Sequence, residues 1–119
     1  MPNLDTSDLG VAIEAYVATV EIRRPPHNFF DVSLINQIAD TYAALDARDD
    51  CRAIVLCAAG KNFCAGANFG ASDSAGGKTS TDGQLSNDLY RHAVRIFRST
   101  KPVVAAVQGA AIGGGLGLA

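Results

Sequence analysis

The sequence has no excess of basic charge and no long hydrophobic run. Its 119 residues contain 10 Lys and Arg against 12 Asp and Glu, a formal net charge of −2. Nucleic acids and anionic membrane surfaces favour a basic face on their partners, and this balance offers none. The apolar runs, such as Val103–Val107, are far too short to span a bilayer. We therefore expect neither a nucleic-acid partner nor a membrane partner.

Cysteine is also scarce. Cys51, Cys57 and Cys64 are an odd number and lack the paired spacing of metal ligands. Residues 1–5 lack the positive start and the long apolar segment of a secretory signal. These absences predict reduced thiols, no metal site and a cytoplasmic protein.

What is present in the first half predicts a hairpin followed by a helix. Residues 11–23 alternate between apolar and polar with a period of two, and the pattern turns near residues 14–16, as in two short strands at a sheet edge. Asp31 is a suitable N-cap for a helix over Val32–Ala47. Spacings of three and four predict the inner face of that helix, which consists of Ile35, Ile38, Tyr42 and Leu45.

The second half predicts two buried strands separated by a loop and a helix. The strands are Arg52–Cys57 and Pro102–Val107, both short continuous apolar runs. Gly70–Gly83 is rich in Gly, Ser, Thr and Asp, which indicates a mobile loop over a binding site. A helix over Gln84–Ser99 has its inner face at Leu85, Leu89, Ala93 and Ile96. This order is typical of an α/β layer with right-handed crossovers.

An unusual loop follows each predicted strand. The first is Lys61–Phe69, and the second is Gly109–Ala119, which has three consecutive glycines where a helix begins. In an open α/β sheet, ligands bind beyond the carboxyl ends of the strands, so both loops lie at one site if the strands are parallel neighbours. One backbone N–H from each loop would then converge on a substrate carbonyl oxygen and stabilise an enolate, each contributing on the order of 3 kcal/mol.

Three segments resemble motifs of the enoyl-CoA hydratase/isomerase (crotonase) superfamily. Phe63–Asn68 resembles its F-x-A-G-A-D loop, Lys101–Gly115 its K-P-V-I-A-A-V-x-G-x-x-x-G-G-G segment, and Ile22–Pro25 its L-N-R-P. The resemblance covers nearly all of the chain in the same order. It implies that residues 1–119 are the N-terminal portion of a single domain, a crotonase-like α/β spiral core truncated after the glycine-rich loop and the first helical turn.

The same resemblance implies a site for an acyl-CoA thioester. The oxyanion-hole donors fall on the backbone N–H groups of Ala65 and Gly114. The 65–68 loop is expected to meet the adenine end of coenzyme A, and Arg24 its phosphates, although Asn68 replaces the usual Asp of the motif. No separate cofactor is expected, because coenzyme A is part of the substrate. The residues implied to contact coenzyme A are Arg24, Ala65, Gly66, Ala67 and Asn68.

The departures from the family pattern leave two functions open. Gly117 stands where a hydratase carries a glutamate, and the second catalytic carboxylate would lie beyond Ala119, so neither of the paired carboxylates of hydration is present. One interpretation is hydration or isomerisation of enoyl-CoA in fatty-acid degradation by a complete protein, assembled as a trimer or hexamer. The other is a non-catalytic truncated remnant or an acyl-CoA-binding module. We expect the isolated chain to be inactive as a hydratase and poorly stable.

Other chemistries find no support in the sequence. Gly77-Lys78-Thr79 imitates the end of a phosphate-binding P-loop, but Ser72 stands where that pattern requires glycine. No G-x-S-x-G segment provides a serine nucleophile. Cys64 lies beside the proposed site, yet we interpret it as a small buried thiol because no His–acid pair accompanies it.

Overall fold

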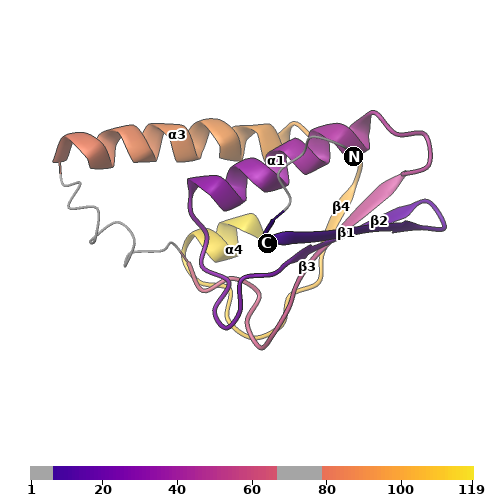
Figure 1. Cartoon of the computed structure of the whole chain (residues 1–119), viewed down its shortest axis with the longest axis horizontal. Helices are drawn as coiled ribbons and strands as arrows, with labels where there is room; N and C mark the ends of the chain where they lie inside the picture. The colour runs from indigo at the N-terminus through magenta and orange to yellow at the C-terminus, as the bar shows by residue number, and fades with distance from the viewer. Residues whose placement is uncertain (1–6, 67–78) are drawn as a thin grey trace.

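The chain folds as an open sheet with helices on one face (Figure 1). The structure is a computed structural model that describes residues 7–66 and 79–119, without the side chains of residues 79–87. The prediction of an α/β fold is confirmed within these residues.

The first two strands form the predicted edge hairpin. β1 (Leu9–Glu14) pairs antiparallel with β2 (Val17–Ile22). The two residues that join them, Ala15 and Tyr16, both have positive φ, of 51° and 67°. A two-residue turn of this kind matches the right-handed twist of hairpin strands. The turn therefore lies where the alternating pattern predicted it.

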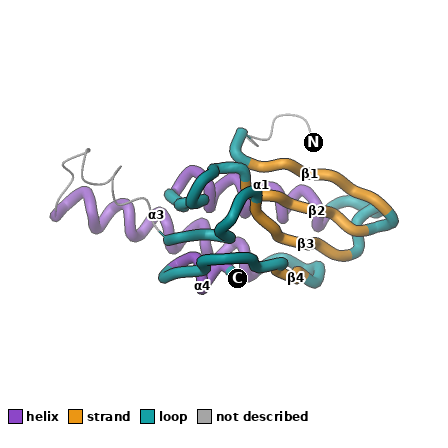
Figure 2. Tube along the Cα trace, turned by 90° about the horizontal axis from the view of Figure 1, so that it is seen from below, coloured by secondary structure: helices purple, strands orange, loops and turns teal. Residues whose placement is uncertain are grey.

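The other two strands extend the sheet in parallel. β3 (Ala53–Ala58) pairs with β2, and β4 (Val103–Ala105) pairs with β3, so the strand order is β1-β2-β3-β4. The expected parallel neighbours are confirmed, with β3 displaced by one residue from its predicted range. Because β3 and β4 run in the same direction, the loops that follow them leave the sheet at the same end (Figure 2).

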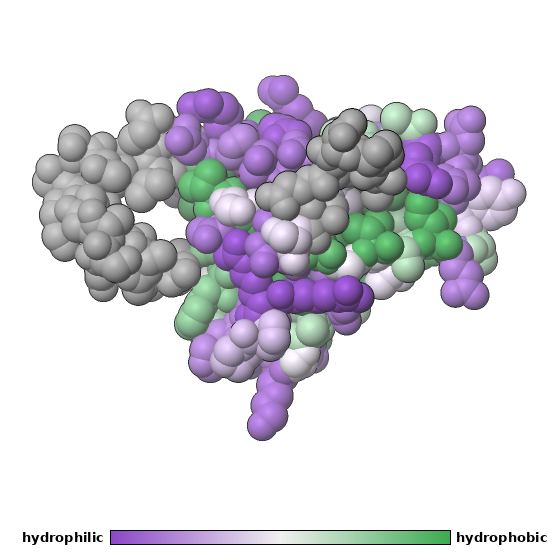
Figure 3. Space-filling model, in the orientation of Figure 1, coloured by the Kyte–Doolittle hydropathy of each residue, from purple (hydrophilic) through white to green (hydrophobic). Residues whose placement is uncertain are grey.

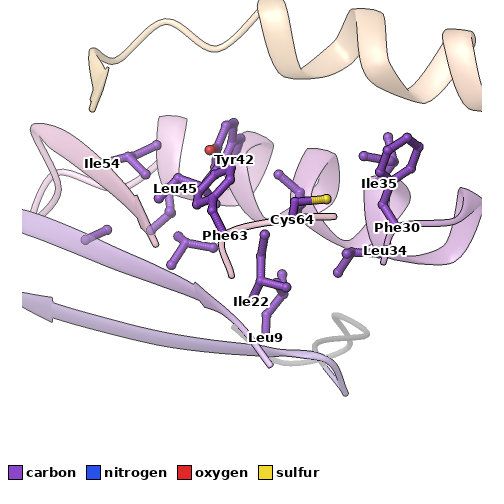
Figure 4. Close-up of a cluster of buried hydrophobic side chains, with 14 of the residues drawn as sticks. Leu9, Ile22, Phe30, Leu34, Ile35, Tyr42, Leu45, Ile54, Phe63 and Cys64 are labelled. Carbon is purple, nitrogen blue, oxygen red and sulfur yellow. The ribbon is translucent and has the colours of Figure 1, made fainter. Parts of the chain in front are cut away.

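Helix α1 (Val32–Asp46) covers the sheet and builds most of the core. The Asp31 side chain accepts a hydrogen bond from the Leu34 N–H at 2.9 Å, which confirms it as the N-cap. All four predicted inner-face residues of α1 are buried and meet the alternate side chains of the strands (Figure 4). The buried strand residues of this cluster include Leu9, Ala18, Val20, Ile22, Ile54 and Leu56.

Helix α3 (Thr79–Phe97) packs against α1 and begins earlier than predicted. Its first five residues fall in the segment that we expected to be a loop, so the prediction for residues 79–83 is wrong. Leu89, Ala93 and Ile96 pack against the core as predicted. Residues 70–78 and the side chain of Leu85 lie outside the described part.

The prediction that Pro102–Val107 is a buried strand is wrong in extent and in burial. Only Val103–Ala105 is a strand, and the Val104 side chain is 64% exposed. The reason is the position of β4 at the end of the sheet, where Ala105 packs against the core but Val103 and Val104 stay exposed. An apolar run indicates that burial of its side chains would be favourable. Whether they are buried depends on the elements that pack against the strand.

Hydrophilic residues cover much of the face that Figure 3 shows, and green side chains gather toward the end where β1 and β2 lie. Val11 and Ile13 of β1 are partly buried hydrophobic residues packed against the core. None of the helices in residues 7–66 and 79–119 is long and apolar enough to cross a membrane.

Candidate functional site

The loops after β3 and β4 lie side by side, as the parallel sheet predicted. The Phe63 N–H donates to the Gln108 carbonyl at 2.8 Å, and the Cys64 N–H donates to the Ala110 carbonyl at 3.1 Å. The Ile112 N–H returns a bond to the Cys64 carbonyl at 3.1 Å. These three bonds form a short parallel ladder beyond the main sheet and bring the 61–66 loop against the glycine-rich segment.

Asn28 anchors a third segment to these loops. It is fully buried, and its φ of 53° is a left-handed conformation that Asn tolerates better than most residues. Its Nδ2 donates to the carbonyls of Ala59 and Asn62, both at 2.7 Å, and its Oδ1 accepts from the Arg24 N–H at 2.9 Å. Sequence reasoning missed Asn28, and its one signal was an Asn beside a diproline turn.

Two further amides continue this network toward the glycine-rich segment. The Asn62 Oδ1 accepts from the Ala110 N–H at 3.0 Å. The Gln108 Nε2 donates to the carbonyls of Ala58 and Gly60, at 2.7 and 3.0 Å. Amide side chains thus satisfy loop backbone groups that no regular strand pairs, which fixes the separation of the two loops.

The three consecutive glycines, residues 113–115, are required for different steric reasons. Gly113 precedes α4 (Gly114–Leu118) with a φ of 57°. A Cβ on Gly114 would lie 2.2 Å from Cζ of the Phe30 ring, and a Cβ on Gly115 would lie 2.1 Å from the Cys64 carbonyl oxygen. The last two glycines therefore allow α4 to approach the 61–66 loop and Phe30 closely.

Gly114 forms part of the wall of an apolar cavity between α1, α3 and α4. The cavity has a volume of about 390 Å³. No acceptor among the described residues pairs with the Gly114 N–H. Gly117 lies in the same wall, and a Cβ there would meet no atom within 4 Å. The lining consists of Phe30, Ile35, Leu89, Tyr90, Ala93, Ile96, Phe97, Gly114, Gly117 and Leu118.

The structure does not leave the Ala65 N–H free, although the resemblance assigns it to the oxyanion hole. This N–H donates to the His27 carbonyl at 3.0 Å. Gly66 also has an internal role, because its carbonyl accepts from the Phe30 N–H at 2.9 Å. Ala67 and Asn68 lie outside the described residues. Ala65 and Gly114 thus belong to loops in contact, and of these two residues it is Gly114 whose N–H has no acceptor within residues 7–66 and 79–119.

Arg24 is occupied by carboxylates, whereas the resemblance implied phosphates. Its Nη2 lies 2.8 Å from Asp8 Oδ2, and its Nη1 lies 3.0 Å from Asp31 Oδ1. The hydrogen bond from Arg24 is the main cause that holds the pKa of Asp8 below its usual value. A buried Gln37 adds a second donor to Asp8 at 2.9 Å. Arg24 therefore ties the start of β1 to the N-terminus of α1.

Cys64 is a buried thiol beneath the two loops. Burial raises its pKa, which disfavours the thiolate that nucleophilic chemistry needs. The three cysteines are free thiols. In the parts of the chain with described side chains, no three His, Cys, Asp or Glu residues are grouped as metal ligands.

Comparison with known proteins gives a family match over most of the chain. The model of the family described as "Enoyl-CoA hydratase/isomerase" matches residues 12–119. The chain is 38% identical over 102 residues to a peroxisomal fatty acid beta-oxidation multifunctional protein of Oryza sativa subsp. japonica, which is 86% of this chain and 14% of that protein. It is 33% identical over 105 residues to 4-chlorobenzoyl coenzyme A dehalogenase-2 of an Arthrobacter species, which is 86% of this chain and 38% of that protein.

Solved structures agree with the family match. An enoyl-CoA hydratase from Shewanella pealeana superimposes with a TM-score of 0.83 at 30% sequence identity. The superposition covers 96% of this chain and 44% of that one. The chain therefore has the fold that its motifs predicted, and it spans less than half the length of these relatives.

Proposed function

Since the chain belongs to the enoyl-CoA hydratase/isomerase family, we propose that it binds an acyl-CoA thioester at Gly114. The acyl group occupies the apolar cavity, and the Gly114 N–H donates to the thioester carbonyl oxygen. One observation carries the proposal: Gly114 combines an N–H that no acceptor in the described part of the chain pairs with and a place in the wall of a 390 Å³ cavity. A backbone N–H that already points at this oxygen stabilises the negative charge that develops on it.

We assign the second donor of the oxyanion hole to the 65–68 loop. Ala65 serves as this donor if its N–H exchanges the His27 carbonyl for the thioester oxygen. That exchange replaces one hydrogen bond by another and costs about 1 kcal/mol at most. The same loop, through Gly66, Ala67 and Asn68, is proposed to contact the coenzyme A moiety.

The lining of the cavity sets a limit on the chemistry that this chain performs alone. None of the lining residues with described side chains is a carboxylic acid, and Gly117 has no side chain to transfer a proton. Binding and polarisation are therefore proposed for residues 1–119, and hydration or isomerisation for a protein that supplies a carboxylate. The lack of a side chain at Gly117, where a hydratase carries a glutamate, also favours a second candidate function, that of a non-catalytic acyl-CoA-binding module. A homo-oligomer and a cytoplasmic location remain predictions.

Calorimetric titration of the full chain with a non-hydrolysable acyl-CoA tests the proposal, with coenzyme A alone as the reference ligand. The acyl compound is expected to bind at least tenfold more tightly. Phe97→Glu places a charge in the cavity wall at an exposed position and is expected to weaken acyl-CoA binding at least tenfold. Leu116→Glu is the matched control, because Leu116 is exposed and lies outside the cavity lining.

Equal affinities for acyl-CoA and coenzyme A, in a sample that circular dichroism shows to be folded, would contradict the proposed site. An absorbance assay on crotonyl-CoA separates the two candidates for the isolated chain. Binding without turnover is expected, and brisk hydration would show that a base outside the cavity lining acts.

A further inference from the structure

The cavity at Gly114 is larger than a short acyl group requires. It is a half-open cavity of about 390 Å³, and the lining residues Tyr90 and Phe97 are exposed. An apolar protein cavity of about 150 Å³ lined by Leu, Ile and Phe is enough to hold benzene. This cavity is more than twice that size, so a ring fits with room for the thioester carbon beside it.

Gly117 is one cause of this width. It lies in the cavity wall, and a Cβ built on it contacts no atom within 4 Å. Any larger residue at 117 would project into unfilled space along this wall. Glycine therefore leaves open the part of the cavity that lies one helical turn from the Gly114 N–H, where the groups next to the thioester carbonyl would lie.

The lining also favours a ring over an alkyl chain. Three aromatic side chains, Phe30, Tyr90 and Phe97, come from both sides of the cavity. Aromatic pairs in offset or edge-to-face contact attract each other beyond what the burial of their area provides. Tyr90 and Phe97 are exposed on α3, so their rings are available to a ligand.

Among the residues whose side chains the structure describes, none that lines the cavity is charged. A carboxylate on the far end of an acyl group would lose its water there and gain no partner, which is strongly unfavourable. The cavity should therefore reject the CoA thioesters of dicarboxylic acids.

We propose that the preferred ligand class is a CoA thioester of an uncharged aromatic acid, with its ring between α3 and Gly117. This inference rests on the proposed acyl-CoA site and adds its selectivity. Gly117 is then the specificity-determining residue, because it keeps the wall open for the ring.

The test is a calorimetric titration of the full chain with benzoyl-CoA, acetyl-CoA, octanoyl-CoA and succinyl-CoA. Benzoyl-CoA is expected to bind at least tenfold more tightly than acetyl-CoA, and succinyl-CoA no better than acetyl-CoA. Gly117→Leu should reduce the preference for benzoyl-CoA over acetyl-CoA from at least tenfold to about twofold. Because leucine has a higher helix propensity than glycine and meets open space here, folding is expected to survive. Leu116→Ala, beside Gly117 but outside the lining, should keep the preference.

The outcomes separate the inference from the proposed function. Binding of all four thioesters with equal affinity would leave the acyl-CoA site standing and overturn its selectivity. Octanoyl-CoA as the tightest ligand would show an alkyl cavity and also overturn the inference. Absence of binding by every thioester would contradict the proposed function itself. A Gly117→Leu protein that still prefers benzoyl-CoA would show that the ring lies elsewhere.

Discussion

Asn28 is a single buried side chain that joins three loops. Asn28→Ala removes both donors to the Ala59 and Asn62 carbonyls and leaves these acceptors unpaired. Each unsatisfied buried group costs about 1–3 kcal/mol, and Ala also tolerates the left-handed φ less well. We expect the free energy of unfolding to fall by about 3 kcal/mol in urea denaturation. Asn36→Ala is the control and should cost under about 1 kcal/mol, because Asn36 accepts one bond from Arg95 at a partly buried site. Equal losses in the two variants would contradict the anchoring role.

The sequence predicts the apolar residues of this molecule better than its polar ones. The inner face of α1 follows from spacing alone, since it depends on residues three and four apart. Arg24 was assigned to coenzyme A and the Ala65 N–H to the oxyanion hole, but each has a partner distant in sequence, Asp8 and the His27 carbonyl respectively. No local pattern signals such pairs, so these two site assignments could not be judged before the fold was known.

At the scale of the element, α1 contains a buried hydroxyl without a partner. Oγ1 of Thr41 is fully buried and has no hydrogen bond to any described residue. Thr41→Val replaces this hydroxyl with a methyl group of similar shape and removes the cost of an unpaired polar atom. We expect a gain of about 1 kcal/mol in unfolding free energy, seen as a higher urea midpoint. Thr100→Val, at an exposed position, should stay within about 0.5 kcal/mol of the parent. A loss of stability in Thr41→Val would mean that the hydroxyl does find a partner.

The elements differ in how far their sequence determines them. α1 has an N-cap and a regular apolar face, and its predicted start is confirmed. The start of α3 lacks such an apolar face, and the predicted boundary was wrong by five residues. The prediction that β4 is a parallel strand is confirmed. Its side chains are exposed, because burial depends on which elements pack over the strand, and the residues of β4 do not specify those elements.

At the scale of the whole molecule, the Asp8–Arg24–Asp31 group connects β1, the turn after β2 and the start of α1. The pKa of Asp8 is lowered in the folded chain from the ordinary value of 3.8. The stabilisation by ionised Asp8 is therefore fully present above pH 3.8 and is lost as the pH falls through the lower, folded pKa. Asp8→Asn should reduce the free energy of unfolding at neutral pH by about 1 kcal/mol or less. Below pH 3.8, the free energy of unfolding of this variant should fall less steeply with decreasing pH than that of the parent.

Thermal unfolding of the parent and of Asp8→Asn at pH values from about 2 to about 7, in steps of about one unit, measures this pH dependence of stability. Asp49→Asn is the control, because Asp49 is exposed on the surface. It should leave the shape of the curve unchanged. A decline in Asp8→Asn as steep as in the parent would assign the acid sensitivity to other carboxylates.

The sheet ends in a strand that has a neighbour on one side only. β4 bonds to β3, while the opposite edge of its backbone meets no strand among the described residues. Such an edge carries free amides and carbonyls next to exposed valines, and it accepts any extended segment that reaches it. We therefore expect association of this chain through the β4 edge to increase with protein concentration.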